Sequence, residues 1–384
     1  MIDLDATAGL AEHATARELS LPDELELRPT QGVPKWFGNT IARWVFRAAS
    51  MEEQPISARQ GGLSPIEGYY RRDRHVHPRI DSSRYQLKVT GVAQDRSFAL
   101  ADLRALPQTE RLCVMECAGN GNHLMGSAGL MGQARWKGPS LAAVLSACGG
   151  SGSARHFAFR GLDSIRWLKS GYHYGLSLDE LCEANAVLAL TMNGEPLSRR
   201  HGFPLRLMVP RIYSMSHVKW LGHIEGKTRR HRGVHNDFVF TNKELRDGQW
   251  VRVQARWIGL KSLVTRCRRV PGGWVLHGWA WGGEHPIERL EVSTDGGESW
   301  QGASLAAASG SFAGENAVDE RDARGAWSTF AYHWKQPAPG VYSVAARAFD
   351  SDGTPQRMHE DTQVKGHFNQ CRVKWRSVVI PAES

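Results

Sequence analysis

Cys117 stands where a thiolate could meet a bound ligand. It ends an alternating, largely apolar run over 111–117, a pattern typical of a buried strand, and Ala118-Gly119-Asn120-Gly121 follows it. The two glycines permit backbone conformations closed to other residues, so a ligand could approach the chain closely at this exit. A thiolate in such a place is a soft ligand for a redox metal. The alternative is a core cysteine that merely ends a strand, because free cysteines are commonly buried.

Three neighbouring arginines and one isolated arginine indicate anion binding. Arg71, Arg72 and Arg74 lie close together in sequence, and the planar guanidinium group binds phosphates and oxyanions bidentately. The alternative for this segment alone is a solvated basic loop. Arg206 enters the otherwise apolar run 205–209, where a buried guanidinium is costly unless an anion neutralises it. A bound phosphate would do so.

Cysteine usage narrows the metal chemistry. The chain has six cysteines and no Cys-x-x-Cys pair, which argues against a zinc ribbon, a thioredoxin-type site and c-type haem attachment. Zinc held by Cys113 and Cys117 would need two more ligands, and only His123 lies close in sequence. A disulfide framework is not expected in a chain of this size with so few cysteines.

Length and composition set the outer bounds. A chain of 384 residues predicts two domains, and 41% hydrophobic with 23% charged residues is typical of a soluble globular protein. The net charge of +9 favours anionic ligands, while the absence of a long Lys/Arg run argues against nucleic acid. No apolar run could span a membrane, and residues 1–30 show no secretory signal. We therefore expect a cytoplasmic protein, or a periplasmic one if the native start lies elsewhere.

Short periodic segments must position these residues. Strands are predicted over 85–92, 111–117 and 157–161, and helices over 100–107, 141–148 and 179–184. From about residue 253 the pattern changes to short strands and glycine turns, with strands over 273–281, 287–294 and 341–350. Apolar residues at near-helical spacing predict an amphipathic helix over 36–45.

Several segments resemble, in order, the motifs of the sulfite oxidase family of molybdenum enzymes. These segments are Ser64–Pro78, Glu116–Gly121, Ala134–Leu141, Phe157–Ser164, Met192–Leu197, His201–Pro210 and Ser216–Leu221. In that family the cysteine at the position of Cys117 gives molybdenum its single protein thiolate, and the remaining sulfurs come from the dithiolene of one pyranopterin. The resemblance thus implies a molybdenum–molybdopterin cofactor with Cys117 as the metal ligand, and no haem domain.

The resemblance also implies roles for other residues. Arg72 takes the active-site arginine position, Asp73 replaces the usual Asn and Arg74 the usual His, so Cys117, Arg72 and Arg74 are the predicted catalytic residues. The predicted cofactor-binding residues are Tyr70, Arg71, Arg72, Asp73, Arg74, Asp163, His201, Arg206, His217, Val218 and Lys219.

The predicted fold is α+β: a mixed α/β molybdopterin-binding sulfite oxidase fold followed by an immunoglobulin-like antiparallel β-sandwich. We assign 61–250 to the oxidoreductase domain, 251–384 to a sandwich through which relatives form homodimers, and 1–60 to an N-terminal extension that packs on the main domain. The words Gly278-Trp279-Ala280-Trp281 and Ser293–Trp300 carry the resemblance in the second domain.

Three substrate-pocket residues of the family are not matched, and this weakens sulfite as the substrate more than it weakens the cofactor. Asn122 stands at the position of an arginine, a tryptophan has no counterpart, and 231–241 contains no tyrosine, so Phe238 or Phe240 is expected to fill that space. Lys365 stands near the position from which some relatives extend an arginine into the active site.

These features predict an enzyme of oxygen-atom transfer. The leading hypothesis is oxidation of a small oxyanion, sulfite to sulfate, with electrons passed to a separate protein such as a c-type cytochrome. An S- or N-oxide reductase using the same cofactor is the alternative. A third hypothesis, a non-catalytic binding protein, is disfavoured by the retained Cys117.

Overall fold

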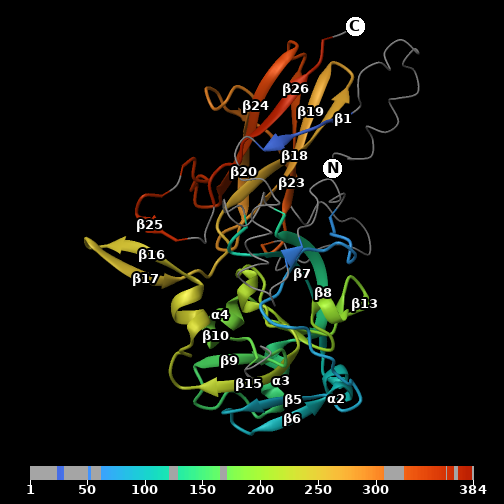
Figure 1. Ribbon diagram of the computed structural model, residues 1–384, viewed down its shortest axis with the longest axis vertical. Helices are drawn as coiled ribbons and strands as arrows, with labels where there is room; N and C mark the ends of the chain where they lie inside the picture. The colour runs from blue at the N-terminus through green and yellow to red at the C-terminus, as the bar shows by residue number, and fades with distance from the viewer. Residues whose placement is uncertain are drawn as a thin grey trace.

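The computed structural model describes residues 24–29, 51–52, 62–120, 129–164, 171–306, 324–359, 361–366 and 371–382. Two strand-rich parts lie one above the other along the long axis (Figure 1). The predicted helix over 36–45 and the residues Gly121, Asn122 and His123 lie outside the described residues.

Two sheets organise the lower part. One has the strand order β10-β9-β15-β5-β6, with β15 parallel to β5 and antiparallel to β9. Its strands are β5 Gln86–Thr90, β6 Arg96–Ala99, β9 His156–Gly161, β10 His173–Ser177 and β15 Leu221–Lys227. The other has the order β13-β12-β8-β7, with β7 Gln108–Glu116, β8 Met131–Pro139, β12 Thr191–Met192 and β13 Glu195–Pro196.

Shorter elements complete this part. Two pairs of strands are β3 Met51–Glu52 with β4 Arg71–Arg72, and β11 Val187–Ala189 with β14 Arg206–Met208. The helices are α2 Leu100–Ala105, α3 Leu141–Ala147 and α4 Leu178–Glu183, and single turns form η2 Arg199–His201, η3 Ser214–Ser216 and η4 His235–Val239. Ser140 and Ser177 cap α3 and α4, because each side chain accepts a hydrogen bond from a backbone N–H of the first turn.

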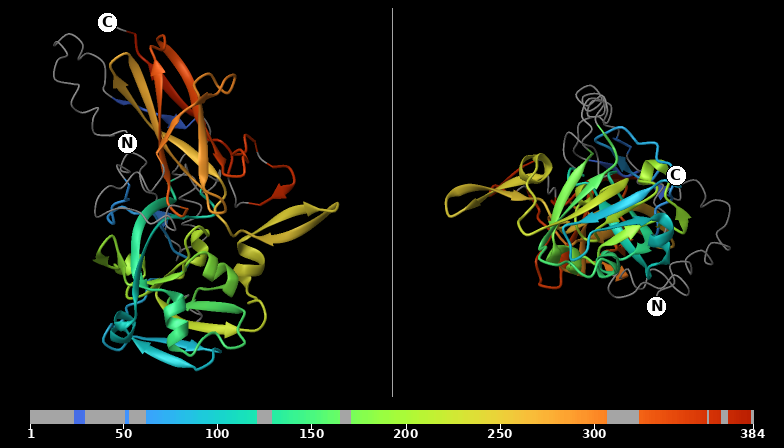
Figure 2. Two further views of the ribbon diagram at one scale, coloured as in Figure 1. Left: turned by 180° about the vertical axis from the view of Figure 1, so that it is seen from behind. Right: turned by 90° about the horizontal axis from the view of Figure 1, so that it is seen from below.

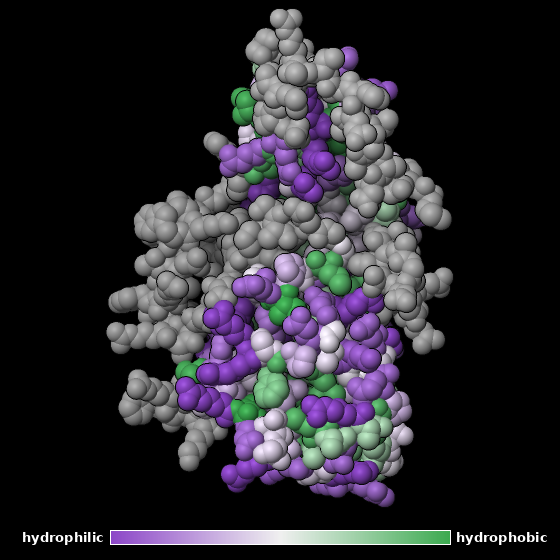
Figure 3. All heavy atoms as spheres, turned by 90° about the vertical axis from the view of Figure 1, so that its right-hand side faces the viewer, coloured by the Kyte–Doolittle hydropathy of each residue, from purple (hydrophilic) through white to green (hydrophobic). Residues whose placement is uncertain are grey.

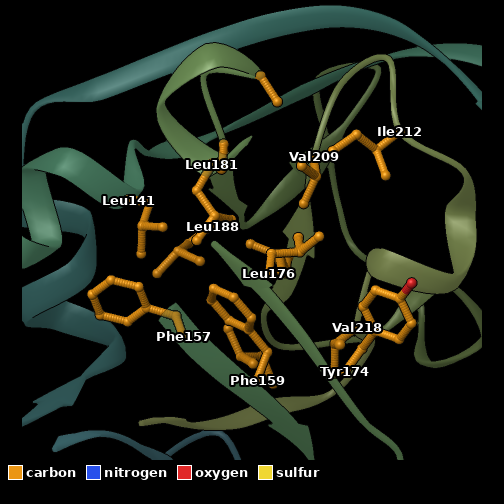
Figure 4. Packing of buried hydrophobic residues seen from close by; sticks show 14 of the residues in the cluster. Leu141, Phe157, Phe159, Tyr174, Leu176, Leu181, Leu188, Val209, Ile212 and Val218 are labelled. Carbon is orange, nitrogen blue, oxygen red and sulfur yellow. The ribbon is translucent and has the colours of Figure 1, made fainter. Parts of the chain in front are cut away.

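One large hydrophobic core holds these sheets and helices together. Alternate residues of β5, Leu87 and Val89, are fully buried, as a strand with one solvent-facing side requires. Phe157 and Phe159 of β9 lie beside Leu141 of α3 and Leu181 of α4 (Figure 4). This packing fixes the loops at the ends of β9 and β15, which reach the candidate site.

The upper part is a sandwich of two antiparallel five-stranded sheets with the orders β1-β18-β19-β23-β22 and β2-β26-β24-β20-β21. Their strands are β1 Glu24–Leu25, β2 Arg28–Pro29, β18 Lys261–Val270, β19 Gly273–Trp281, β20 Ile287–Ser293, β21 Gln301–Gly302, β22 Ser304–Ala306, β23 Ser328–Lys335, β24 Gly340–Asp350 and β26 Arg376–Ile380. Buried residues of both sheets, among them Leu276 and Val378, form one shared core. The segment 24–29 thus adds one short strand to each sheet of the sandwich.

A third small sheet extends from the side of the molecule. It consists of β16 Thr241–Arg246, β17 Gln249–Gln254 and β25 Val364–Lys365, and the β16–β17 hairpin projects outward in Figures 1 and 2. In Figure 3, which shows one side, hydrophobic residues of the lower part are interspersed among hydrophilic ones. Within the ranges given above, no helix has both the length and the apolar run needed to cross a bilayer.

The architecture agrees with the sequence-based expectation in outline. Strands dominate and the α-helices have only six or seven residues, so the α+β class fits loosely. The antiparallel sandwich forms in the part of the chain where the sequence pattern changes to short strands and glycine turns. Its immunoglobulin-like strand order and the exact domain limits stay predictions.

Candidate active site

Cys117 follows the last residue of β7 directly, at the start of a tight turn. The Cys117 N–H donates to the Leu130 carbonyl at 3.0 Å, and its own carbonyl accepts from the Asn120 N–H at 2.8 Å. The Asn120 side chain closes the turn, because its oxygen accepts from the Leu130 N–H at 3.0 Å and its nitrogen donates to Glu116 Oε1 at 2.8 Å. The thiol is therefore held in place at the mouth of the strand, 8% exposed.

Behind the thiol, Glu116 is tied to the upper part of the molecule. Its carboxylate is fully buried and accepts from Lys261 Nζ at 2.7 Å and from Trp281 Nε1 at 2.9 Å. Lys261 begins β18 and Trp281 ends β19, so two strands of the sandwich contact the residue next to Cys117. This network links the sandwich to the thiol-bearing turn.

In front of the thiol lies a pocket that opens to solvent. It is lined by Tyr70, Arg71, Arg72, Asp73, Arg74, Met115, Cys117, Ala118, Asp163, Tyr172, His201, Arg206, Ser214, Met215, His217, Lys219, Trp220 and Phe240. Every predicted site residue except Val218 is in this set. The Val218 side chain is instead fully buried in the large hydrophobic core.

The charges of the pocket favour an anion. Five lining side chains are basic, Arg71, Arg72, Arg74, Arg206 and Lys219, and two are carboxylates, Asp73 and Asp163. The two lining histidines are held neutral, since burial lowers the pKa of His201 to about 4 and that of His217 to about 3, with Arg206 contributing to both shifts. The excess of positive charge is thus permanent at neutral pH.

Asp73 and Asp163 organise the rim of the pocket. Asp73 is fully buried and forms an ion pair with Lys219. Its Oδ2 also lies 2.7 Å from His77 Nε2 and 3.4 Å from Arg71 Nε. Asp163 Oδ2 lies 2.9 Å from His75 Nδ1, and its Oδ1 accepts from the Tyr172 N–H at 3.0 Å. Both carboxylates are therefore already paired with groups of the protein.

Arg206 occupies the most buried cationic position. Its guanidinium donates to the His201 carbonyl at 3.0 Å and to Met115 Sδ at 3.2 Å, and stacks 4.7 Å from the Trp136 ring centroid. Burial lowers its pKa to about 10, so it keeps its charge at neutral pH. No carboxylate contacts it among the described residues, and an anion in the pocket would compensate this buried charge.

Several buried polar atoms of lining residues have no hydrogen-bond partner among the described residues. They include the hydroxyl of Tyr70, Nη1 of Arg72, Nε of Arg206 and Nδ1 of His217. His217 Nε2 lies 2.8 Å from the Val209 carbonyl, so in the neutral ring Nε2 carries the proton and Nδ1 is an acceptor. Arg206 Nε and His217 Nδ1 fit an anionic group rich in oxygen and nitrogen, such as a pyranopterin phosphate, while the Tyr70 hydroxyl and Arg72 Nη1 are two further donors of the pocket lining.

The thiol fits a metal ligand supplied by one protein side chain. Burial raises the pKa of Cys117, while the Gly119 N–H and the Arg72 guanidinium lower it. A bound metal would hold the sulfur as thiolate. Within the described parts of the chain, no three His, Cys, Asp or Glu side chains gather closely enough to hold a metal ion.

Comparisons with known proteins agree with this geometry. The model of the oxidoreductase molybdopterin binding domain matches residues 74–235, and that of the Mo-co oxidoreductase dimerisation domain matches 262–380. Human mitochondrial sulfite oxidase is 30% identical over 329 residues, which is 76% of this chain and 56% of the human protein. The sulfite oxidase of Arabidopsis thaliana is 26% identical over 357 residues, 83% of this chain and 88% of the plant protein. The chain belongs to the sulfite oxidase family.

A solved structure shows the same fold. The sulfane dehydrogenase SoxCD from Paracoccus pantotrophus aligns with a TM-score of 0.72 over 97% of this chain and 95% of that chain, at 20% identity. The chain spans about half the length of the mammalian sulfite oxidases it matches, 52% of the mouse protein and 56% of the human one.

Within this sulfite oxidase family member, the pocket contains residues that sequence reasoning missed. Tyr172, between β9 and β10, lines the pocket and donates its hydroxyl proton to the Met215 carbonyl at 2.6 Å. Its ring lies 4.6 Å from that of His235 in η4. Met115 could have been found from the alternation of β7, but no local pattern points to Tyr172, Met215 or the neighbouring Ser214.

The structure also resolves the aromatic alternatives of the family's variable segment. Phe240 lines the pocket with Arg74 stacked 5.1 Å from its ring centroid, whereas Phe238 is 65% exposed. Lys365 lies in β25, with its ammonium group 4.0 Å from the Trp250 ring centroid on the projecting sheet. It is not among the described residues that line the pocket.

Proposed function

We propose that this chain is a molybdenum-dependent oxidoreductase that transfers an oxygen atom, oxidising sulfite and water to sulfate, two protons and two electrons. The electrons pass to a separate protein such as a c-type cytochrome. One observation carries the proposal: a single thiol faces a pocket with surplus positive charge and unpaired buried donors. The family membership and its sulfite oxidase relatives support it.

The residues of the pocket divide between two tasks. Arg206, Lys219 and His217 would hold the molybdopterin, because two cations and a histidine acceptor suit a phosphate and a nitrogen-rich ring. Arg72 and Arg74 would bind the oxyanion, since both lie near Cys117 and the Arg72 guanidinium retains an unpaired Nη1. When bound, the molybdenum cofactor supplies the two-electron redox chemistry.

Burial of Arg72 and Arg74 strengthens their preference for an anion. Burial and the neighbouring Arg72 both lower the pKa of Arg74, because each disfavours its charged form. An oxyanion between them relieves that repulsion, whereas a neutral molecule of the same shape does not. The pair therefore favours anionic substrates in this proposal.

The test is a paired assay on protein expressed in a host that makes the cofactor. We expect about one molybdenum and one pterin per chain, and sulfite oxidation with ferricyanide or cytochrome c as acceptor. Cys117→Ser should lower both the molybdenum content and the activity, while Cys182→Ser, at an exposed cysteine, serves as the control. Molybdenum-loaded protein that fails to oxidise sulfite would refute the substrate assignment.

A specific feature supports the alternative, an S- or N-oxide reductase. Phe240, Met115 and Met215 give the pocket an apolar side on which the organic part of such a substrate could pack. Reduction of a sulfoxide with a reduced viologen as donor, in protein that leaves sulfite unchanged, would favour this second function.

We also propose a homodimer formed through the sandwich, supported by the match to the dimerisation domain over 262–380. Light scattering on the purified protein should give twice the chain mass of 42.7 kDa. The cytoplasmic location, the separate electron acceptor and the absence of haem remain predictions.

A further inference from the structure

Tyr70 carries an uncommitted hydroxyl in the wall of the pocket. The residue precedes β4, is 2% exposed, and stacks on Tyr69 with ring centroids 5.5 Å apart. Its hydroxyl is fully buried and makes no hydrogen bond. The Ser214 side chain also lines the pocket and is near enough to lower the pKa of the phenol, but no hydrogen bond of standard geometry forms between the two hydroxyls.

The hydroxyl keeps its proton. A tyrosine hydroxyl has a usual pKa near 10, so it is protonated at neutral pH, and burial only raises its pKa. A buried phenol that stays neutral is a hydrogen-bond donor, and leaving a buried donor unsatisfied is destabilising. A ligand acceptor in the pocket would satisfy it.

The neighbours of Tyr70 locate that acceptor. Its ring belongs to the same cluster of buried side chains as Cys117 and Met115, and both Tyr70 and Cys117 line the pocket. Lys219 interacts with Asp73. The Tyr70 hydroxyl therefore belongs to the thiol end of the pocket.

The second phenol of the pocket, Tyr172, differs because its hydroxyl already donates a hydrogen bond to the protein. Tyr172 also lines the pocket and stays protonated because burial raises its pKa, but its proton is already donated to the Met215 carbonyl at 2.6 Å. Of the two phenols in the described lining, only Tyr70 has a proton available for a ligand.

We propose that the Tyr70 hydroxyl donates a hydrogen bond to an oxygen of the oxyanion bound in front of Cys117. Together with the unpaired Nη1 of Arg72, it makes a mixed site of one neutral and one charged donor. Such a site discriminates against anions that place no oxygen at the phenol, because the hydroxyl would then stay unsatisfied. The assignment rests on the proposed function, since it takes a substrate oxyanion as the ligand of the thiol end.

The test is Tyr70→Phe in cofactor-loaded protein, with sulfate, the proposed product, as the probe. Calorimetric titration should show sulfate binding weakened about 10- to 100-fold, the range for a lost hydrogen bond to a charged group. The Michaelis constant for sulfite should rise by a similar factor. Molybdenum and pterin content should stay at the wild-type level.

Tyr69→Phe is the matched control, because Tyr69 is the stacked neighbour, is equally buried and does not line the pocket. It should leave sulfate affinity within about twofold of wild type. Unchanged sulfate affinity in Tyr70→Phe would overturn the proposal. Loss of pterin from this variant would also overturn it, because the hydroxyl would then bind the cofactor. Sulfate binding needs no turnover, so this result is read separately from failure of the sulfite assay.

Discussion

Two buried lysine–carboxylate pairs flank Cys117, and they are built differently. Behind the thiol, Lys261 pairs with Glu116, whose carboxylate also accepts from Asn120 and Trp281. On the pocket side, Lys219 pairs with Asp73. The Lys261–Glu116 pair lies in the contact between the sandwich and β7. The Lys219–Asp73 pair lies at the edge of the pocket, which other cationic side chains also line.

The pKa shifts express this difference. Burial alone would lower the pKa of Lys261, but Glu116 and the neighbouring Tyr213 and Cys371 outweigh it, and the net shift is upward. For Lys219, burial outweighs Asp73, and Arg206 and Arg71 lower the pKa further. A buried lysine is thus fully compensated where the structure is closed, and under-compensated where an anionic ligand is expected to bind.

Breaking the closed pair should have the largest effect. Lys261→Met leaves the Glu116 carboxylate buried without its cation, which should lower the free energy of unfolding by about 3 to 5 kcal/mol. Denaturant unfolding measures this. Glu116→Gln in the same chain should recover part of the loss, because the buried charge is removed. A loss below about 1 kcal/mol for Lys261→Met would show that the pair is not the closed contact described here.

Part of the pH dependence should come from the pocket side, where His201 and His217 are buried and neutral. Their pKa values of about 4 and about 3 lie below the value near 6.5 of an unfolded histidine, so the unfolded chain binds more protons below pH 6.5. Stability is therefore full above pH 6.5 and is lost as the pH falls towards 4. Between pH 7 and 5.5 the two histidines together should cost about 2 kcal/mol. His217→Gln should reduce this slope, and an unchanged slope would assign it to other groups.

Local sequence patterns were sufficient to predict single strands and the burial of residues within them. The run 111–117 predicts β7 Gln108–Glu116 with Cys117 at its exit, and the strand 273–281 is β19 with the same limits. Arg206 was expected to be buried and to need an anion, and it lies buried in the pocket wall. In these cases the period of the apolar residues carries the information.

Contacts between distant segments were beyond such patterns. Glu116 meets Lys261 across 145 residues, and neither residue has a local signal for its partner. β1 is a two-residue strand whose place beside β18 is decided by the sandwich edge it covers. Tyr172 is held at the pocket by the hydrogen bond from its N–H to Asp163, a contact that no spacing rule describes.

Breaking the open pair should have a smaller effect on stability than breaking the closed one. Lys219→Met removes one cation, but Asp73 keeps His77 at 2.7 Å and Arg71 at 3.4 Å, so we expect a loss of about 1 kcal/mol in denaturant unfolding. The same variant should lose pterin during purification, which Lys261→Met should do only through its lower stability. A loss equal to that of Lys261→Met would abolish the distinction between the two pairs.

The smallest effect should come from an exposed pair, which sets the baseline for the other two. Arg266 donates to Glu24 through two nitrogens, at 3.0 and 2.7 Å, and joins β1 to β18, but the two side chains are 31% and 45% exposed. Glu24→Gln should therefore change the free energy of unfolding by less than about 1 kcal/mol. Salt at about 1 M should reduce even this difference, because screening weakens exposed pairs far more than buried ones. The Lys261→Met loss should persist in the same salt, and a similar salt response in both variants would mean that water reaches the Glu116 carboxylate.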